Sequence, residues 1–329
     1  MGVTVVPGLD SAFDQRLSDG LELVDQRLRE VLRHDEPFIA GASRHLLDAG
    51  GKRFRPLLTL LVSELGTGCN ERVIDAAAGV ELTHLASLYH DDVMDEATLR
   101  RGVTAANVVY DNSTAILIGD LLFGRASQLV AGLGAEAVRI QADTFVRLCA
   151  GQIEDDRQAP EGQDPMAYYL RVLEDKTGSL ISLAARYGGI FSGLPAATIE
   201  RVVRYGELLG MVFQLSDDLI DITSDQEESG KKAGTDLREG VTTLPVLYVR
   251  SSADPDDARL QQLLSRPIAD PAELDEALGL LRAHKAMQQA RDHTMSVANQ
   301  AADLLADLPD GDAVQALRAL PISVAERTV

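Results

Sequence analysis

The chain has 329 residues, of which 45% are hydrophobic and 25% are charged, and its formal net charge at pH 7 is −20. This composition is typical of a globular protein with a large core, and it excludes a disordered or fibrous chain. The acidic balance argues against a nucleic-acid-binding surface, which needs a basic patch, and against an electrostatic anchor to anionic lipid.

The sequence shows no sign of export or of a membrane anchor. Its first residues, MGVTVVPGLDSAFDQ, lack the basic start and the long apolar run of a signal peptide. No stretch of about eighteen uncharged apolar residues, the length of a membrane span, occurs in the chain. The two cysteines, Cys69 and Cys149, indicate neither a disulfide framework nor a zinc site. We therefore predict a soluble cytoplasmic protein.

Apolar residues recur at three- and four-residue spacing along most of the chain, for example over 17–32 and 201–221, and this periodicity predicts helices. Breaks rich in glycine, proline and polar residues fall at 35–38, 47–56, 65–71, 100–104, 131–137, 158–165, 192–197 and 224–240. No linker rich in proline, glycine and serine divides the chain. We therefore predict an all-α bundle with a single domain over residues 1–329.

Two clusters of aspartates end predicted helices, one in HDDVMDEATLRRG and one in FQLSDDLID. Their members are Asp91, Asp92 and Asp95 in the first cluster and Asp217, Asp218 and Asp221 in the second. Like charges four residues apart destabilise a helix, and carboxylates at a helix C-terminus oppose the macrodipole. A locally unfavourable pattern that occurs twice is expected at a functional site.

The spacing of each cluster suits a divalent cation. The first and last aspartates lie one helical turn apart, so both carboxylates can reach the same ion. Magnesium prefers oxygen ligands and is usually held by one or two carboxylates together with substrate phosphates.

Basic residues stand at helix junctions despite the acidic balance. In GGKRFRP, Lys52, Arg53 and Arg55 lie at a helix start, where free backbone N–H groups favour an anion. Other basic residues follow the two aspartate clusters or lie in EDKTGS: Arg100, Arg101, Lys176, Lys231 and Lys232. Together they predict a site for more than one phosphate group.

The motifs GGKRFRP, HDDVMDEATLRRG, KTGSL, FQLSDDLID and GKKAGTDLREGVTTLP stand in the order found in trans-type polyprenyl diphosphate synthases, which the chain resembles over most of its length. The resemblance is to the long-chain bacterial type. It implies an all-helical isoprenoid synthase-like fold with a central cavity, a homodimer, and aspartate motifs that face each other across the mouth. It also implies a prenyltransferase that joins isopentenyl diphosphate to an allylic diphosphate.

The resemblance also implies roles for individual residues. Asp91 and Asp95 would bind two magnesium ions and Asp217 a third, with the other three aspartates in support, and Lys176 would join the six aspartates as a catalytic residue. The implied contacts to the allylic diphosphate are Arg100, Lys176, Thr177, Gln214 and Lys231. The implied contacts to isopentenyl diphosphate are Lys52, Arg55, His84 and Arg101. Val241 stands where many members of the family have a lysine, which Lys232 or Arg238 could replace.

Small residues precede the aspartates on both helices, and each helical turn left open adds about 5.4 Å of depth, comparable to one isoprene unit. The candidate residues of this chain-length pocket are Val80, Thr83, Ala86, Ser87, Gly206 and Gly210. Short-chain members of the family tend to carry aromatic residues at the positions of Ala86 and Ser87. We therefore predict a long product, hexaprenyl to decaprenyl, with geranylgeranyl or farnesyl as the alternative. For the two glycines, close helix packing is an equal explanation.

Two other functions remain possible for this sequence. A class I terpene cyclase would need a second motif of mixed Asn, Ser and Glu residues, and FQLSDDLID is an aspartate motif instead. A non-catalytic subunit of a heteromeric synthase generally lacks one aspartate motif, and this chain has both.

Overall fold

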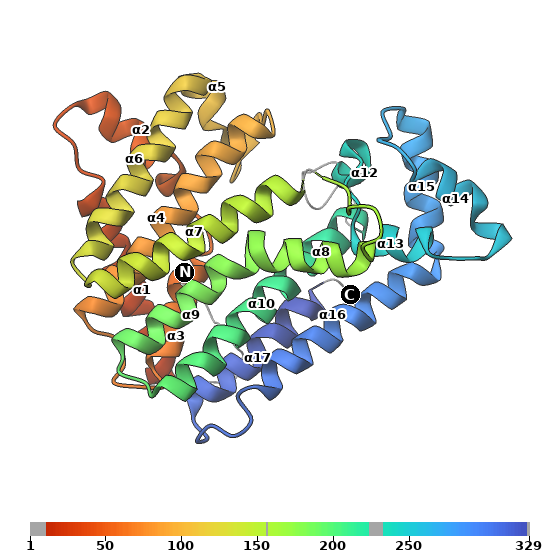
Figure 1. Cartoon of the computed structure of the whole chain (residues 1–329). Coiled ribbons are helices and arrows are strands. Elements are labelled where there is room, and N and C mark those ends of the chain that lie inside the picture. Colours follow the sequence, from red (N-terminus) through yellow and green to blue (C-terminus); the bar gives the residue numbers. More distant parts are fainter. Residues whose placement is uncertain (1–10, 156, 224–232, 328–329) are drawn as a thin grey trace. The chain divides into compact units, whose positions relative to one another are not determined.

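The computed structural model describes residues 11–155, 157–223 and 233–327 (Figure 1). Within these ranges the chain is almost entirely helical, and its only strands have two residues each. The predicted all-α fold is therefore confirmed.

The elements follow the periodic segments and breaks of the sequence. The first half contains α1 (Ser11–Val31), α2 (Pro37–Asp48), α3 (Phe54–Ser63), α4 (Glu71–Met94), β1 (Leu99–Arg100), β2 (Val103–Thr104), α5 (Ala106–Tyr110), α6 (Asn112–Ala131) and α7 (Ala135–Asp155). The second half contains α8 (Pro165–Leu173), a π-helical turn η1 (Glu174–Gly178), α9 (Ser179–Phe191), α10 (Ala196–Thr223), α12 (Thr235–Glu239), α13 (Leu244–Arg250), a 3₁₀ turn η2 (Pro255–Asp257), α14 (Ala258–Leu263), α15 (Pro271–Ala283), α16 (Lys285–Asp303) and α17 (Asp312–Glu326).

Several helices begin at a polar residue whose side chain caps the first turn. Asn70 accepts hydrogen bonds from the N–H groups of Arg72 and Val73 at the start of α4. Asp164 and Asp270 do the same for α8 and α15, where a proline follows as the first helical residue. Proline lacks an N–H group that would otherwise need a partner there, so this pairing fixes where a helix starts.

The chain divides into two compact units. Unit 1 consists of Met1–Val146, Leu180–Val203 and Leu308–Leu317, and unit 2 of Arg147–Ser179, Arg204–Asp307 and Arg318–Val329. The first aspartate cluster belongs to unit 1 and the second to unit 2. The single domain over 1–329 stays a prediction.

In unit 1, α4 packs against α1, α3, α5 and α6. Its apolar and small side chains are buried over most of its length, as expected of a helix covered on all sides. Gly79 lets α6 approach closely, since a Cβ atom there would lie 2.7 Å from Cγ2 of Val130. The aspartates at the end of α4 therefore stand on a well-anchored helix.

Among the described helices, α6 is the one long and apolar enough to cross a membrane. A core helix of a soluble protein has the same properties, and α6 packs against α4 and α5. One helix of this length and composition is weak evidence for a membrane span. The cytoplasmic location stays a prediction.

The break predicted at 100–104 forms a β-hairpin. Leu99 pairs with Thr104 and Arg100 with Val103 in an antiparallel ladder. Arg101 and Gly102 form the turn with φ angles of 53° and 78°, as expected of the tight turns that join two strands. The hairpin turns the chain directly after the first aspartate cluster.

Candidate active site

The three aspartates of the first cluster have different surroundings. Asp92 is fully buried and accepts hydrogen bonds from Nε of Arg100 (2.6 Å) and from the N–H group of Ala106 (3.3 Å). Asp91 is half-buried and Asp95 is exposed. Asp92 therefore links α4 to the hairpin and to the start of α5 through hydrogen bonds. The carboxylate of Asp95 remains accessible to solvent.

Arg100, a predicted contact to the allylic diphosphate, lies beside these aspartates. Besides its hydrogen bond to Asp92, its Nη2 lies 3.5 Å from Oδ2 of Asp95. The guanidinium group thus offsets part of the negative charge of the cluster. It stands where an arginine could also contact a phosphate held by the same carboxylates.

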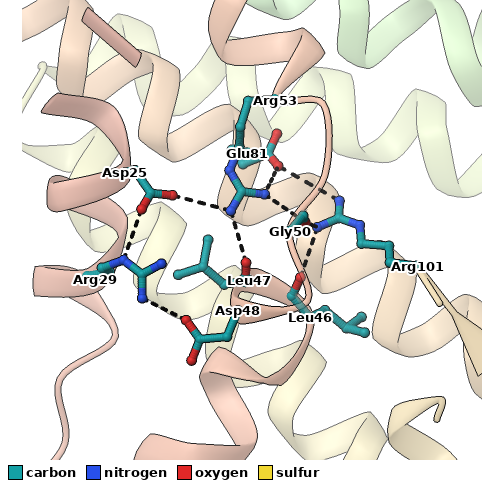
Figure 2. Close-up of polar contacts among 9 residues, drawn as sticks. All are labelled: Asp25, Arg29, Leu46, Leu47, Asp48, Gly50, Arg53, Glu81 and Arg101. Atoms are coloured by element: carbon teal, nitrogen blue, oxygen red, sulfur yellow. Dashed lines mark hydrogen bonds and ion pairs between the residues drawn. The ribbon is translucent and has the colours of Figure 1, made fainter. Parts of the chain in front are cut away.

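The GGKRFRP segment forms a strained loop before α3. Gly50, Gly51 and Arg53 have φ angles of 92°, 132° and 49°. The φ angle of Gly51 favours glycine, and its missing side chain leaves room for the guanidinium group of Arg101, since a Cβ atom there would lie 2.9 Å from Cζ of Arg101. Nη1 of Arg101 donates to the carbonyl oxygens of Leu46 (2.9 Å) and Gly50 (2.5 Å) (Figure 2). Arg101, predicted as a substrate contact, therefore also holds this loop.

The other predicted isopentenyl diphosphate contacts lie in the same unit. Lys52 is exposed, and Arg55 is half-buried with its Nε atom buried and without a hydrogen-bond partner. Burial lowers the pKa of Arg55 to about 10, opposed by the nearby Glu81, so the group stays charged at neutral pH. Burial also lowers the pKa of His84 well below its usual value, and Arg55 and Arg101 add to this effect. The imidazole of His84 is thus neutral near pH 7.

In the second cluster, each aspartate again has its own partners. Asp218 is buried and accepts hydrogen bonds from the hydroxyl group of Tyr169 and from Nε2 of Gln214 (2.9 Å). Asp217 is exposed, and its Oδ1 lies 2.8 Å from Nη2 of Arg327. The carboxylate of Asp221 accepts from the N–H groups of Thr235 (3.2 Å) and Asp236 (3.1 Å). Asp218 and Asp221 are thereby fixed in place.

Two carboxyl groups, Asp218 of the second cluster and the neighbouring Asp236, have raised pKa values. Burial raises the pKa of Asp218 to about 6, although Tyr169 and Gln214 oppose the shift. Burial, and then repulsion from Asp218 and Asp221, raises the pKa of Asp236 to about 8. Asp236 and Tyr169 carry no signal in the sequence, because their proximity to the cluster depends on tertiary structure.

Lys176 and Thr177 lie in the π-helical turn η1. Nζ of Lys176 lies 2.5 Å from Oδ2 of Asp155, and the hydroxyl group of Thr177 donates to Oε1 of Gln214 (3.3 Å). Hydrogen bonds therefore link the predicted contacts Thr177 and Gln214 to Asp218, and Lys176 lies on the same turn of unit 2 as Thr177. Turns of this kind are frequent at functional sites.

Glycines surround this turn closely. A Cβ atom on Gly210 would lie 2.5 Å from Cα of Gly178, and one on Gly151 would lie 2.5 Å from the backbone nitrogen of Lys176. An added side chain at Gly210 would meet backbone atoms and not empty space. These distances support close helix packing as the explanation of Gly210, in place of an enlarged product pocket.

The remaining pocket candidates are mostly buried. Val80, Thr83 and Ala86 are at most 1% exposed, Gly206 is buried and Ser87 is half-buried. The hydroxyl group of Thr83 donates to the carbonyl oxygen of Gly79 (2.9 Å) and accepts from Nε2 of Gln141 (3.0 Å). Its polar atom is thus satisfied within unit 1. Whether these residues border the product stays a prediction.

Lys231 and Lys232 lie outside the described residues. Val241 is partly exposed, and Nη2 of Arg238 donates to the carbonyl oxygen of Ala233 (3.1 Å). Arg238 therefore binds the backbone near the second cluster. That it replaces the lysine found at the position of Val241 in many family members stays a prediction.

The described side chains contain no group of three or more His, Cys, Asp or Glu residues arranged around one metal position. Magnesium does not need such a group, because it is commonly bound by one or two carboxylates together with phosphate and water oxygens. The donor set of both clusters consists of carboxylate oxygens, the ligand type that magnesium prefers. The residues present therefore fit a magnesium ion shared with a phosphorylated substrate.

The chain is similar to known proteins over most of its length. The sequence model of one family, described as polyprenyl synthetase, matches residues 36–281. A nonaprenyl diphosphate synthase of Mycobacterium tuberculosis is 48% identical over 321 residues, which is 96% of each chain. A decaprenyl diphosphate synthase from Rhodobacter capsulatus superposes with a TM-score of 0.87 at 33% identity, covering 96% of this chain and 98% of the other.

A shorter-product enzyme is similar to the same degree in structure. The geranylgeranyl pyrophosphate synthase from Corynebacterium glutamicum, complexed with calcium and isoprenyl diphosphate, has a TM-score of 0.87 at 40% identity. The comparison covers 97% of this chain and 98% of that one. The predicted family is confirmed by these matches.

Proposed function

Because the chain belongs to the polyprenyl synthetase family, we propose that its two aspartate clusters and their neighbouring cations carry out prenyl transfer between two diphosphates. The protein is a prenyltransferase that adds isopentenyl diphosphate to an allylic diphosphate and makes long-chain all-trans polyprenyl diphosphates. The observation that carries the proposal is that each cluster has polar partners suited to a diphosphate. Arg100 lies beside Asp92 and Asp95. Gln214 donates to Asp218 and accepts from Thr177, which is next to Lys176 on the π-helical turn.

The reaction begins with loss of the allylic diphosphate. Asp91, Asp95 and Asp217 would hold magnesium ions, two at the first cluster and one at the second, and bound magnesium neutralises charge that develops on the leaving oxygen. Lys176, Arg100 and Thr177 contact the same diphosphate and stabilise its negative charge as the C–O bond breaks. Asp92 and Asp218, which are buried and hydrogen-bonded, keep the cluster backbone and side chains in position.

The second substrate attacks the resulting carbocation. Lys52, Arg55, Arg101 and neutral His84 hold the diphosphate of isopentenyl diphosphate, so that its double bond lies next to the cation. The new C–C bond leaves a positive charge on the former isopentenyl unit. Loss of a proton to the released diphosphate removes this charge and forms the new double bond, so no separate side-chain base is needed.

The length of the product is set by the space below the first cluster. Ala86 and Ser87 are small, which favours a product between hexaprenyl and decaprenyl. The similarity to a nonaprenyl and a decaprenyl diphosphate synthase supports this range. A geranylgeranyl product is the alternative, supported by the likeness to the Corynebacterium enzyme.

We propose that the enzyme acts as a homodimer. Unit 1 exposes large apolar side chains on α6 and on the first part of α7: Ile116, Leu117, Val138 and Val146. Stacking of Phe123 on Phe145, with ring centroids 4.1 Å apart, holds these two helices together. Exposed apolar patches of this kind mark interaction sites, and a second copy of the chain would cover them.

An elongation assay tests the proposed function. The purified protein would be incubated with magnesium, labelled isopentenyl diphosphate and geranyl, farnesyl or geranylgeranyl diphosphate, and the dephosphorylated products would be separated by length. Long polyprenols are expected. The absence of elongation with every primer would contradict the proposal and favour a subunit that needs a partner, whereas cyclic hydrocarbons would indicate a cyclase.

The change Ala86→Phe is expected to shorten the main product by at least about one isoprene unit. A phenyl ring on this face of α4 would fill about one helical turn of depth, which corresponds to about 5.4 Å. Product length would be measured with the same assay, and Ala76→Ser, two to three turns earlier on α4, would serve as a small-for-small control. An unchanged product would mean that the chain does not pass Ala86.

Acidic pH is expected to stabilise the metal-free protein through Asp236. Its pKa is about 8 in the folded chain and lower in the unfolded chain, so the folded state binds the proton more tightly. This contribution is present below pH 4 and is lost as the pH rises to about 8. In EDTA, Asp236→Asn should therefore raise the melting temperature at pH 8.5 and have little effect near pH 4. Equal effects at both pH values would contradict the assignment.

A further inference from the structure

A buried carboxylate lies within the predicted isopentenyl diphosphate site and has no part in the chemistry described above. Glu81 is on α4, three residues before His84, and is 2% exposed. Its Oε1 lies 3.4 Å from Nη1 of Arg53 and 3.9 Å from Nη2 of Arg101 (Figure 2). A carboxylate that has lost its contact with water must be compensated by nearby positive groups, and these two guanidinium groups compensate Glu81.

The same two arginines hold the backbone of the Gly50–Gly51 loop. Arg53 donates to the carbonyl oxygens of Leu47 (3.0 Å) and Gly50 (3.1 Å). Arg101 also donates to Gly50 and to Leu46. The last carbonyl groups of a helix lack partners within the helix, so the arginines complete the end of α2. Glu81 thus binds the two side chains that fix this loop from both sides.

Arg53 also connects Glu81 to a chain of ion pairs that reaches the surface. Nη2 of Arg53 lies 3.3 Å from Oδ1 of Asp25, and Asp25 accepts from Nε of Arg29 (2.9 Å). Nη1 of Arg29 donates to Asp48 at the end of α2 (2.6 Å), as Figure 2 shows. Asp25 and Arg29 are much more exposed than Glu81, and exposed ion pairs contribute little. The position of Arg53, and with it that of the Gly50–Gly51 loop, therefore depends mainly on Glu81.

A carboxylate among these cations repels a diphosphate, so Glu81 must favour binding in another way. Glu81 is the strongest electrostatic attraction for both Arg55 and Arg101, while these two cations repel each other. Without this carboxylate, three guanidinium groups would stand close together with no buried counter-charge. Their repulsion would displace the loop that presents Lys52.

We propose that Glu81 is a positioning residue for isopentenyl diphosphate: it holds Arg53 and Arg101 and thereby sets the loop that presents Lys52 and Arg55. The inference rests on the proposed function. It predicts that Glu81 acts on one substrate only, because the network contains none of the residues assigned to the allylic diphosphate.

Steady-state kinetics of Glu81→Gln would test this role. The KM for isopentenyl diphosphate is expected to rise about tenfold or more, the effect of losing a charge-assisted hydrogen bond. The KM for farnesyl diphosphate and the kcat value should change less than about threefold, the pattern of lost binding that is equal in ground and transition states. Glu71→Gln, the same change at an exposed position of α4, is the control and should leave both KM values unchanged.

Two outcomes would overturn the inference: an unchanged KM for isopentenyl diphosphate, whether or not the melting temperature falls, or an equal rise in both KM values. If Glu81→Gln does not fold, Asp25→Asn provides a second test. This partly exposed residue binds Arg53 in the same network, so its replacement should raise the KM for isopentenyl diphosphate by a smaller factor, about two- to threefold, and leave the KM for farnesyl diphosphate unchanged. A wild-type protein without elongation activity would instead refute the proposed function.

Discussion

Replacing Asp217 with asparagine is expected to lower kcat by a factor of about 10³ while the protein stays folded. The carboxylate is exposed, so its replacement by an amide of the same shape leaves packing intact. Asparagine lacks the negative charge that a magnesium ion needs from this position. Asp91→Asn should have a similar effect, and the double variant should be little worse than either, because residues that act as a unit are not additive.

The measurement is single-turnover elongation with saturating magnesium, together with the melting temperature of each variant. Asp292→Asn, at an exposed position of α16, is the matched control and should retain wild-type activity. Removal of magnesium with EDTA should abolish elongation by the wild type, and added magnesium should restore it. Full activity of Asp217→Asn would contradict a role for the second cluster in ionisation.

Much of the fold follows from local properties of the sequence. The three- and four-residue periodicity predicts helices, and the polar breaks from 35–38 to 192–197 all fall between helices of the structure. The boundaries between α5 and α6 and between α8 and α9 have no predicted break. The hairpin at Leu99–Thr104 was not predicted, because strands of two residues are too short to give an alternating pattern. The π-helical form of the turn at Glu174–Gly178 was not predicted either, since it depends on glycines of two other helices.

The aspartate clusters can be predicted from the sequence because their charges are unfavourable at a helix end. The residues around them cannot, because each is favourable in its own helix or loop. Asp91 and Asp217 oppose the dipole of the helix that carries them, a conflict visible in the sequence. Glu81 is a good helix former within a helix and gives no such signal. Its partners Arg53 and Arg101 lie in separate loops and reach it only through left-handed backbone conformations. Contacts of this kind require tertiary structure.

The change Gly210→Ala is expected to lower both stability and activity, although it adds a single methyl group. That group would lie 2.5 Å from Cα of Gly178 and 3.3 Å from the carbonyl oxygen of Thr177, so α10 and the π-helical turn must move apart. Overpacking of this kind costs about 1–3 kcal/mol. The shift would also move Lys176 and Thr177, and a displacement of about 1 Å at a catalytic group can lower the rate about 10²-fold.

Gly279→Ala separates this packing effect from the general effect of replacing a helical glycine. Gly279 lies on α15 with nothing within 4 Å of an added Cβ atom, so alanine there should stabilise the helix by up to about 1 kcal/mol and leave activity unchanged. Melting temperature, kcat and product length would be measured for both variants. If Gly210 instead enlarged the product pocket, Gly210→Ala would shorten the product without loss of stability. A lower melting temperature with reduced kcat and unaltered product length would show that Gly210 serves the diphosphate site by letting α10 approach the turn that carries Lys176.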